Sequence, residues 1–342
     1  MEHKIYRRQR TRFVMLFIQI LLVIVFGIIT FVVYKIDSIP RYNFDRNTVE
    51  AISLRGDYTN IAFFGLDTRP DDNEPSRTDT IMIASINNRT GEVRIISVFR
   101  DTVMQQMDGT LDKASHAYAF GGPREAVAML NRNLDMDIEM YIAVNFISLA
   151  AIIDALGGIQ VNVSSEELRY INHFADDTAI ITGLPAPTWL PEDQPGIVTL
   201  EGVQAVSFTR IRSTAGGDFR RAERQREVLE EVVKGITRAN PLQLMRLANV
   251  VPPELLTNMT TWEIIGQGFN LLRRNLGEMG GYPFELTTGS VAGSAADYVI
   301  PINTNNNVRQ LHGFLFDDFN YQPTERINQI GENINWNTGH LH

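Results

Sequence analysis

The segment that most constrains the fold is Arg77–Thr102, which reads RTDTIMIASINNRTGEVRIISVFRDT. It contains two apolar runs rich in β-branched residues, Thr80–Ile86 and Val93–Val98, on either side of the turn-rich stretch Asn87–Glu92. Such a pattern predicts two strands joined by a hairpin. A connection of six residues is too short for a parallel crossover, so we expect the two strands to be antiparallel.

Charged residues gather at one end of this predicted hairpin. Antiparallel pairing places the start of the first strand beside the end of the second. A third apolar run, Asn60–Leu66, predicts another strand, and if it is parallel to Val93–Val98 its end reaches the same edge. The charged residues of that edge are then Asp67, Arg77, Asp79, Arg100 and Asp101. Polar groups at the ends of buried strands are the usual ligand position in open α/β sheets, so we expect a site here.

An apolar segment near the start of the chain predicts a membrane anchor. Residues 13–34 have no charged side chain, and as a helix they would be roughly 33 Å long, enough to cross a bilayer. Residues 1–12 carry five basic side chains and one acidic side chain, which predicts a cytoplasmic N-terminus and everything after residue 35 outside. No convincing cleavage site follows, so a cleaved signal peptide is disfavoured. The alternative, a buried helix of a soluble protein, rarely has an apolar run of this length.

The rest of the chain is acidic and has no cysteine. The 342 residues have a net charge of −9, and because residues 1–12 contribute +4 the remainder carries −13. That charge excludes a general nucleic-acid footprint, and the absence of cysteine excludes disulfides, thiolate metal sites and cysteine catalysis. Residues 35–58 lack strong periodicity and are interpreted as a juxtamembrane stalk, and residues 59–335 as one extracytoplasmic domain.

Downstream of the hairpin, periodicity and turn residues predict further helices and strands. We expect strands at 141–146, 159–163, 283–286 and 298–302, and helices at 123–134, 147–156, 219–239 and 308–316. An apolar stripe from Trp262 to Leu276 predicts one more helix. The proline-rich stretch 182–196 is expected to be a long surface excursion, and the Asn-rich C-terminal tail is expected to be frayed.

The predicted helix 219–239 begins with basic residues after two glycines. Asp218 is its expected N-cap, and Arg221 and Gln225, four residues apart, share one face. Arginines near a helix N-terminus oppose the helix dipole, but a bound anion would reverse that cost. We expect Arg210, Arg212 and Arg221 to lie at an anion site. For Arg220, Arg224 and Arg226, a solvated basic face fits the sequence about as well as an anion site does.

Eight short motifs occur in order across residues 59–240. They are FGLDTR, RTDT, FRDT, KASHAYAFGGP, VNF, LGGIQVNV, LEGVQAVSFTRIR and GDFRRAERQR. This series, behind the predicted anchor, resembles the LytR-CpsA-Psr family of cell-wall enzymes. The resemblance implies an α/β fold, with a mixed central β-sheet flanked by helices in α/β/α layers and one preceding transmembrane helix. It also implies a phosphotransferase that attaches an anionic glycopolymer, such as a teichoic acid or a capsule, from a polyprenyl diphosphate carrier to peptidoglycan.

The family's functional positions map onto charged residues of this chain. The resemblance assigns diphosphate binding to Arg77, Arg100, Lys113, Arg210, Arg212, Arg221 and Gln225, with Arg100, Arg210, Arg212 and Arg221 also expected to act in catalysis. It assigns Mg²⁺, with Mn²⁺ as the alternative ion, to Asp67 and Asp79. The chemistry agrees, because arginine matches phosphate geometry and Mg²⁺ needs only one or two carboxylates besides substrate phosphates.

Two further residues have open roles. His116 fits a base or an orienting residue, but a histidine in a turn before a helix is more often a capping or packing residue. Asp101 could act in catalysis by activating the acceptor hydroxyl. Alternatively, it could only orient Arg100 or a neighbouring backbone amide. Two other functions stay open: a pyrophosphatase that uses water as the acceptor, and a membrane-tethered regulator that binds wall precursors without chemistry. No nucleic-acid partner is expected.

Overall fold

The computed structural model describes residues 19, 23, 26, 27, 29–52, 54, 56–66, 78–250, 255–272 and 276–339, with the side chains of 269–272 excepted. The predicted cytoplasmic segment 1–12, most of the predicted membrane span 13–34, and the predicted site residues Asp67 and Arg77 lie outside the described residues. Within the described part, no helix combines the length and the hydropathy that crossing a bilayer requires.

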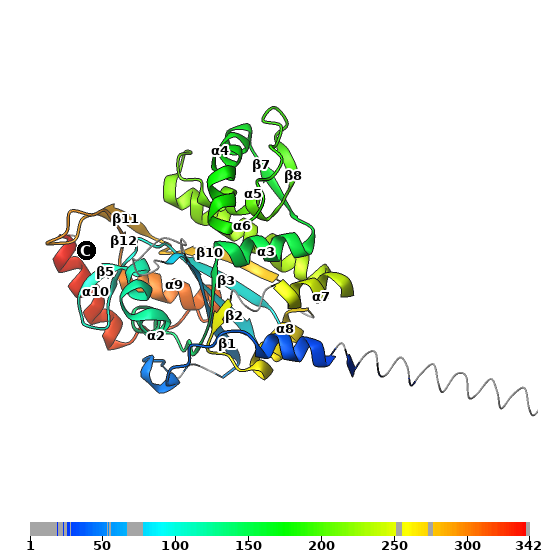
Figure 1. Ribbon diagram of the computed structural model, residues 1–342. Helices are drawn as coiled ribbons and strands as arrows, with labels where there is room; N and C mark the ends of the chain where they lie inside the picture. Colours follow the sequence, from blue (N-terminus) through cyan, green and yellow to red (C-terminus); the bar gives the residue numbers. More distant parts are fainter. Residues whose placement is uncertain are drawn as a thin grey trace, which may run out of the picture.

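A six-stranded mixed sheet forms the middle layer of the domain (Figure 1). Its strand order is β10 (Leu276–Tyr282), β3 (Val93–Val98), β2 (Thr78–Asn87), β1 (Tyr58–Leu66), β6 (Met140–Asn145) and β9 (Leu255–Thr257). The predicted hairpin is confirmed, because β2 and β3 are antiparallel with Ile81 opposite Val98. β1 is antiparallel to β2 and therefore parallel to β3. The ends of β1 and β3 and the start of β2 thus meet at one edge.

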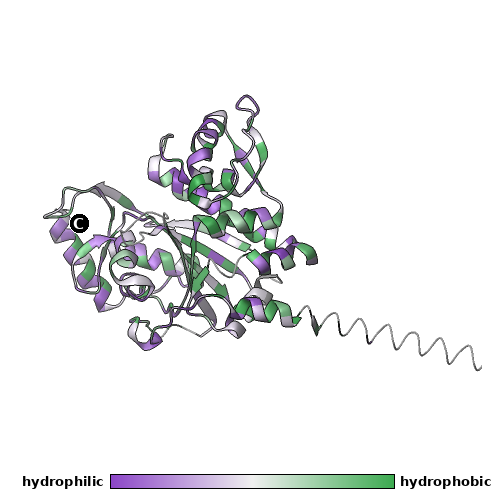
Figure 2. Cartoon of the chain, in the orientation of Figure 1, coloured by the Kyte–Doolittle hydropathy of each residue, from purple (hydrophilic) through white to green (hydrophobic). Residues whose placement is uncertain are grey.

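Alternating side chains of the central strands fill two separate cores, one on each face of the sheet. On one face, Phe64 and Ile83 pack with apolar residues of α2 (Ala114–Leu134) and α9 (Thr304–Phe316). The core of the other face contains Ile61, Met82, Leu229 of α6 (Gly217–Arg238) and Ile264 of α8 (Thr261–Leu272). Figure 2 shows the apolar strands between these helices. The expected mixed sheet between helical layers is confirmed.

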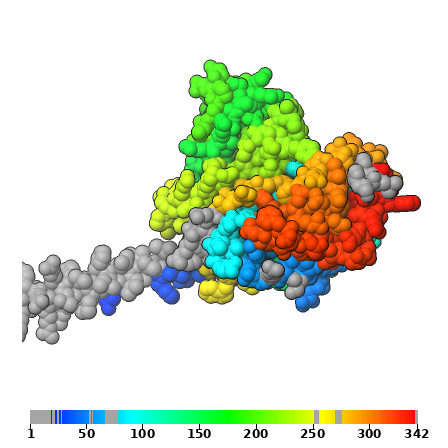
Figure 3. Space-filling model, turned by 180° about the vertical axis from the view of Figure 1, so that it is seen from behind, coloured from blue at the N-terminus to red at the C-terminus, as the bar shows by residue number. Residues whose placement is uncertain are grey.

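A smaller lobe projects from the sheet layer (Figures 1 and 3). It comprises α3 (Phe146–Leu156), β7 (Ile159–Val163), α4 (Ser165–Thr182), β8 (Gly196–Leu200), α5 (Gly202–Arg210) and part of α6. The antiparallel pair β7–β8 and the three helices enclose their own apolar core, which includes Leu168 and Phe208. α6 belongs to both halves of the molecule, since its Val228 lies in the lobe core and its Leu229 contacts the sheet core.

Shorter elements complete the domain. They are η1 (Arg46–Thr48), the hairpin β4 (Val103–Gln105) with β5 (Leu111–Lys113), the hairpin β11 (Leu286–Gly289) with β12 (Tyr298–Pro301), α7 (Pro241–Val250) and α10 (Glu325–Thr338). Val49, in the segment predicted as a stalk, is fully buried in the sheet core. The structure therefore packs part of the region 35–58 against the domain.

Several predicted elements differ from the structure. The helix that contains Trp262 ends at Leu272, and Leu276 begins strand β10 instead of extending the helix. The C-terminal tail is not frayed, because Ile327, Ile330 and Ile334 of α10 are buried. α2 begins at Ala114, earlier than predicted, and its helical geometry breaks at Gly122, after which the predicted segment 123–134 follows.

Candidate active site

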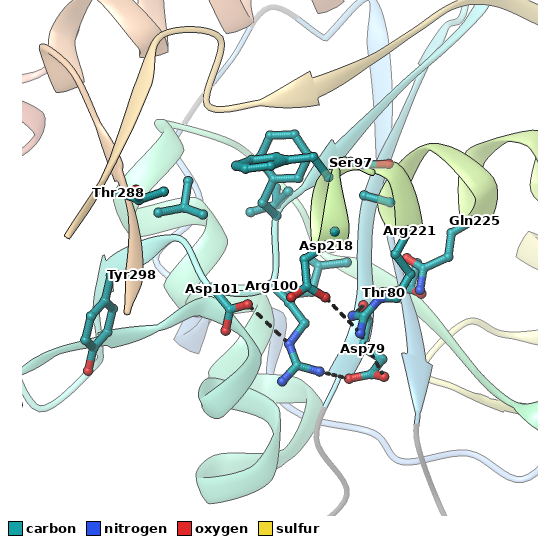
Figure 4. Close-up of a pocket in the computed structure, with 18 of the residues that line it drawn as sticks. Asp79, Thr80, Ser97, Arg100, Asp101, Asp218, Arg221, Gln225, Thr288 and Tyr298 are labelled. Atoms are coloured by element: carbon teal, nitrogen blue, oxygen red, sulfur yellow. Dashed lines mark hydrogen bonds and ion pairs between the residues drawn. The ribbon is translucent and has the colours of Figure 1, made fainter. Parts of the chain in front are cut away.

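A pocket of about 280 Å³ opens at the sheet edge where β2 begins and β3 ends (Figure 4). β2, the turn after β3, the N-terminus of α6 and the β11–β12 region supply its walls. Its polar and charged lining residues are Asp79, Thr80, Ser97, Arg100, Asp101, Asp218, Arg221, Gln225, Thr288, Asp297 and Tyr298. The pocket coincides with the edge at which the sequence predicts a ligand site.

Asp79 lies at the centre of a group of arginines. Its Oδ1 forms an ion pair with Arg100, and its Oδ2 accepts a hydrogen bond from Nη2 of Arg212 at 3.1 Å. Nη1 of Arg221 lies 3.6 Å from the same Oδ2, and Nη2 of Arg221 donates to the Asp79 carbonyl oxygen at 3.1 Å. Three guanidinium groups, from the turn after β3, the α5–α6 connection and α6, thus meet at one residue.

Two glycines shape the start of α6 beside this cluster. Gly216 (φ 91°) caps the helix and Gly217 (φ 50°) is its first residue, and both have left-handed backbone geometry that strains other residues. The prediction that Asp218 is the N-cap is wrong, because the glycine turn starts the helix earlier and Asp218 lies inside its first turn. Asp218 Oδ1 instead lies 3.2 Å from Arg221 Nη1. The helix N-terminus, which lines the pocket, adds a positive dipole end to the arginines.

The Arg221 side chain is buried, and its Nη1 has carboxylates nearby but, within the described part of the chain, no acceptor in hydrogen-bond geometry. Burial lowers the pKa of Arg221, and repulsion from Arg212 and Arg100 adds to the effect although Asp79 and Asp218 oppose it. Among the described residues, Arg221 Nη1 and Arg100 Nε are buried without a hydrogen-bond acceptor. An unpaired buried donor costs free energy. An anion in the pocket would supply acceptors for both donors.

Asp101 links Arg100 to Lys113. Its Oδ2 lies 3.6 Å from Arg100 Nε and its Oδ1 lies 2.8 Å from Lys113 Nζ. The Lys113 ammonium is also 5.4 Å from the centre of the Tyr298 ring, which lines the pocket. Figure 4 shows Arg100 between Asp101 and Asp79. With a cation near each carboxylate oxygen, Asp101 has the geometry of an orienting residue for Arg100.

Arg210 points away from this cluster. Its Nη2 pairs with Asp177 Oδ2 at 2.6 Å and its Nη1 donates to Thr178 Oγ1 at 2.7 Å. The guanidinium also lies 5.9 Å and 5.6 Å from the ring centres of Phe146 and Phe174. The predicted residues that the structure brings together are Asp79, Arg100, Arg212, Arg221 and Gln225, with Asp101 and Lys113 beside them.

Arg224 is neither solvated nor part of the pocket. Its Nε donates to Glu167 Oε1 at 2.9 Å, its Nη1 donates to the Ile211 carbonyl oxygen at 3.0 Å, and its Nη2 donates to Thr214 Oγ1 at 2.5 Å. Arg220 also pairs with Glu167 Oε1 at 3.0 Å. A solvated basic face is therefore wrong for Arg224, which is buried and pairs with Glu167 of α4, whereas Arg220 pairs with Glu167, Glu223 and Glu227.

His116 has a partner that sequence reasoning missed. Its Nδ1 lies 2.8 Å from Asp112 Oδ2, and the hydroxyl of Tyr298 donates to the other Asp112 oxygen at 3.3 Å. These contacts orient the imidazole ring beside the pocket wall. Asp112 belongs to β5 and lies outside α2, so the helical spacing rule does not predict this pair.

The described residues contain no group of three or more His, Cys, Asp or Glu side chains that could hold a metal ion. Asp79 is the predicted metal ligand that the structure describes, and Asp67 lies outside the described residues. Both oxygens of the Asp79 carboxylate contact guanidinium groups, so a metal ion there would have to displace one of them.

Comparisons with known proteins cover most of the chain. A model of the LytR_cpsA_psr family matches residues 35–307. The polyisoprenyl-teichoic acid–peptidoglycan teichoic acid transferase TagU of Bacillus cereus is 31% identical over 218 residues, which are 63% of this chain and 65% of that protein. The chain therefore spans just under two thirds of the length of this relative.

Solved structures share the fold at lower identity. TagT bound to LI-WTA has a TM-score of 0.59 and 21% identity, and the match covers 82% of this chain and 94% of that one. TagT with bound octaprenyl pyrophosphate lipid has a TM-score of 0.56 and 20% identity, with coverage of 82% and 94%. At this identity the likeness establishes the mixed α/β architecture.

Proposed function

The chain belongs to the LytR-CpsA-Psr family, and on that premise we propose that it is a membrane-anchored phosphotransferase of the cell wall. Its substrate is an anionic glycopolymer, a teichoic acid or a capsule, on a polyprenyl diphosphate carrier, and its acceptor is peptidoglycan. The names of the relatives support this assignment, since one is a teichoic acid transferase and another holds octaprenyl pyrophosphate.

One observation carries the proposal: Arg100, Arg212 and Arg221 converge on Asp79 at the wall of a pocket. A diphosphate is a compact group with several negative charges, and guanidinium groups bind such oxygens in a bidentate manner. Two buried donors in this cluster, Arg100 Nε and Arg221 Nη1, lack acceptors among the described residues. A diphosphate would provide them.

In the proposed step, a hydroxyl oxygen of peptidoglycan forms a bond to the phosphorus that carries the glycopolymer. The bond from this phosphorus to the bridging oxygen of the diphosphate breaks, and polyprenyl monophosphate leaves with the electron pair. The hydroxyl proton passes to a base near the acceptor. Arg100, Arg212 and Arg221 neutralise the charge that develops on the phosphate oxygens, which is the main requirement of phosphoryl transfer.

In this proposal, His116 is a candidate to receive that proton. Its Nδ1 faces Asp112 at 2.8 Å, which leaves Nε2 for a second partner. The backbone N–H of its neighbour Ser115 donates to the Arg100 carbonyl oxygen at 3.0 Å, so the start of α2 lies against the pocket. Asp101 orients Arg100 and Lys113 instead.

We assign Mg²⁺, with Mn²⁺ as the alternative, to Asp79 and Asp67 together with the substrate diphosphate. When bound, the ion would draw charge from the phosphate oxygens. Both oxygens of Asp79 contact guanidinium groups, so a cation would take the place of one of them. Arg212 is the contact that moves most easily, because its side chain is 49% exposed.

The proposal places the catalytic domain outside the cell and residues 1–12 in the cytoplasm, joined by a single span over residues 13–34. A protease added outside intact protoplasts should digest the domain and leave a fragment of anchor size. Protection of the whole chain would refute this orientation.

The proposed activity is tested with the full chain in lipid nanodiscs, Mg²⁺, a labelled polyprenyl diphosphate-linked glycan and peptidoglycan. We expect covalent label in peptidoglycan, lost with EDTA and in Asp79→Asn, and retained in the control Arg169→Gln, whose arginine is exposed on α4. Release of free glycan phosphate at the same rate without peptidoglycan would identify a pyrophosphatase. Binding of the lipid without turnover would identify a regulator.

A further inference from the structure

The end of the N-terminal helix, residues 29–37, is fixed to the start of α8. Nη2 of Arg41 donates to Thr261 Oγ1 at 2.8 Å, and the Thr261 hydroxyl donates to Asp37 Oδ1 at 2.7 Å. Nε of Arg41 also donates to the Met259 carbonyl oxygen at 3.0 Å. These bonds make a defined joint between the N-terminal helix and the domain.

An ion pair holds the same joint. Arg46 binds Glu263 with two hydrogen bonds of 2.9 Å and 3.0 Å, in a bidentate arrangement. Asp37 lies three residues beyond Tyr34, where the proposed membrane span ends, and three residues of helix rise about 4.5 Å. The first turn of α8 is therefore about one helical turn from the end of that span.

Exposed aromatic side chains surround the joint. The exposed fractions are 68% for Tyr34, 49% for Tyr42 and 73% for Trp262. Tryptophan and tyrosine with lysine and arginine at the ends of a span are typical of the membrane–water interface. Lys35 supplies a cation here, whereas the guanidinium of Arg41 is engaged in the joint.

α7 extends this apolar surface. None of its residues is buried, and its exposed apolar side chains are Leu242, Leu244, Met245 and Val250. Its other side packs on α3, with Leu247 against the lobe core. Figures 1 and 3 place α7 on the side of the domain from which the N-terminal helix extends. A helix with an exposed apolar face and the exposed Arg246 suits the surface of an anionic bilayer.

We propose that α7 and the first turn of α8 form a second membrane contact, with Trp262 and Leu242 in the boundary between lipid headgroups and acyl chains. This inference rests on the anchor in the proposed function, because the joint then holds the surface against the bilayer. The occupant is lipid, since the joint leaves about one helical turn between α8 and the span. The contact fixes how the catalytic domain stands on the membrane that holds the carrier lipid.

The three tryptophans allow a direct test with the full chain. The double variant Trp189→Phe/Trp336→Phe leaves Trp262 alone, and Trp189→Phe/Trp262→Phe leaves Trp336 alone. Trp336 is 82% exposed on α10, at the end of the molecule opposite the anchor (Figure 1), so it is a matched control. All three residues are largely exposed, so these substitutions leave the core intact.

Both variants are reconstituted in vesicles of phosphatidylglycerol and phosphatidylcholine whose acyl chains carry bromine. We expect blue-shifted emission and strong quenching for Trp262, and no quenching for Trp336. Co-flotation with the vesicles but unquenched Trp262 would overturn the second contact and leave the anchor intact. Failure to float would overturn the anchor and this inference together. A blue shift that depends on protein concentration, without quenching, would instead identify a contact between two copies.

Discussion

Arg221 and Arg224 lie three residues apart on α6 and are almost equally buried, with 2% and 1% of their surface exposed. Arg224 donates to Glu167, to the Ile211 carbonyl oxygen and to the Thr214 hydroxyl, all in or beside the lobe. Arg221 faces the pocket, and its Nη1 has no hydrogen-bond acceptor among the described residues. Burial alone therefore does not distinguish a structural arginine from a ligand-binding one. The two are distinguished by whether each N–H group of the guanidinium has a hydrogen-bond acceptor within the protein.

Arg224→Gln tests the structural half of the comparison and should have the largest effect. Removal of the guanidinium leaves Glu167, whose side chain is 7% exposed, with one buried partner fewer. Arg220 still pairs with Glu167, so we expect a loss of about 3 kcal/mol of unfolding free energy, the lower end for a broken buried pair. Urea denaturation measures this loss, and the exposed Arg169→Gln on α4 should change it by less than about 0.5 kcal/mol. Equal stability of the two variants would contradict the assignment of Arg224.

Arg221→Gln tests whether Arg221 binds the substrate diphosphate. We expect the rate of glycopolymer transfer to fall about 100-fold, or about 2.7 kcal/mol in activation free energy. The pKa of Arg221 is lowered, chiefly by burial, which means that the ligand-free fold disfavours its charge. The free energy of unfolding should therefore stay constant or rise. A loss of stability as large as that of Arg224→Gln would place Arg221 among the structural residues.

Arg212→Gln tests an exposed arginine of the same cluster, for comparison with the buried Arg221. Its side chain is 49% exposed and contacts Asp79 Oδ2 at 3.1 Å. We expect about tenfold weaker binding of a soluble short-chain polyprenyl diphosphate, about 1.4 kcal/mol, with unchanged stability. Titration calorimetry at fixed Mg²⁺ measures the affinity. Unchanged affinity would remove Arg212 from the diphosphate site.

The smallest expected effect is on the pH dependence of stability, since Glu167→Gln also lowers stability at neutral pH by leaving the buried Arg224 without its carboxylate. Burial alone would raise the pKa of Glu167, but hydrogen bonds from Ser164 and Arg224, with the charge of Arg220, lower it below its usual value. A carboxylate of this kind adds stability above its unfolded pKa of about 4.3, and the stability is lost as the pH falls through the lower folded value. Glu167→Gln should therefore flatten the acid limb of a plot of melting temperature against pH. An unchanged acid limb would show that other carboxylates dominate.

The sheet edge was predictable because it depends on local patterns. The hairpin of β2 and β3 follows from two β-branched runs and a six-residue turn. The parallel relation of β1 and β3 was a condition of the prediction, and the structure meets it because β1 is antiparallel to β2. Asp79 and Arg100 are placed by those two strands. Their proximity is therefore a consequence of register, which the alternating pattern determines.

The roles of the arginines on α6 were not predictable from the helix alone. Helical spacing places Arg221 and Gln225 on one face, but the partner of Arg224 comes from α4, 57 residues earlier. The partners of Arg210 could not be predicted for the same reason, since Asp177 and Thr178 also belong to α4. Single-sequence reasoning has no physical measure of contacts between elements so far apart in the chain.

Element boundaries failed where tertiary packing outweighed local preference. Asparagines lower helix propensity, so the tail looked frayed, yet Ile327, Ile330 and Ile334 are buried in α10. Ile330 and Ile334 join Val103 and Ile300 in one apolar cluster, which also contains Tyr298 of the pocket wall. An apolar residue every third or fourth position was the signal to weigh above composition.

α6 has a mechanical consequence because it belongs to both halves of the molecule. Its Val228 lies in the lobe core, its Leu229 contacts the sheet core, and Arg221 sits at the end that reaches Asp79. A helix is stiff over a few turns. A rotation of the lobe against the sheet would therefore move α6 as a rigid body and displace Arg221 near its end. The 3.1 Å bond from Arg221 to the Asp79 carbonyl oxygen would then lengthen. A ligand that binds the lobe and rotates it would thereby change the distance between Arg221 and Asp79 in the pocket.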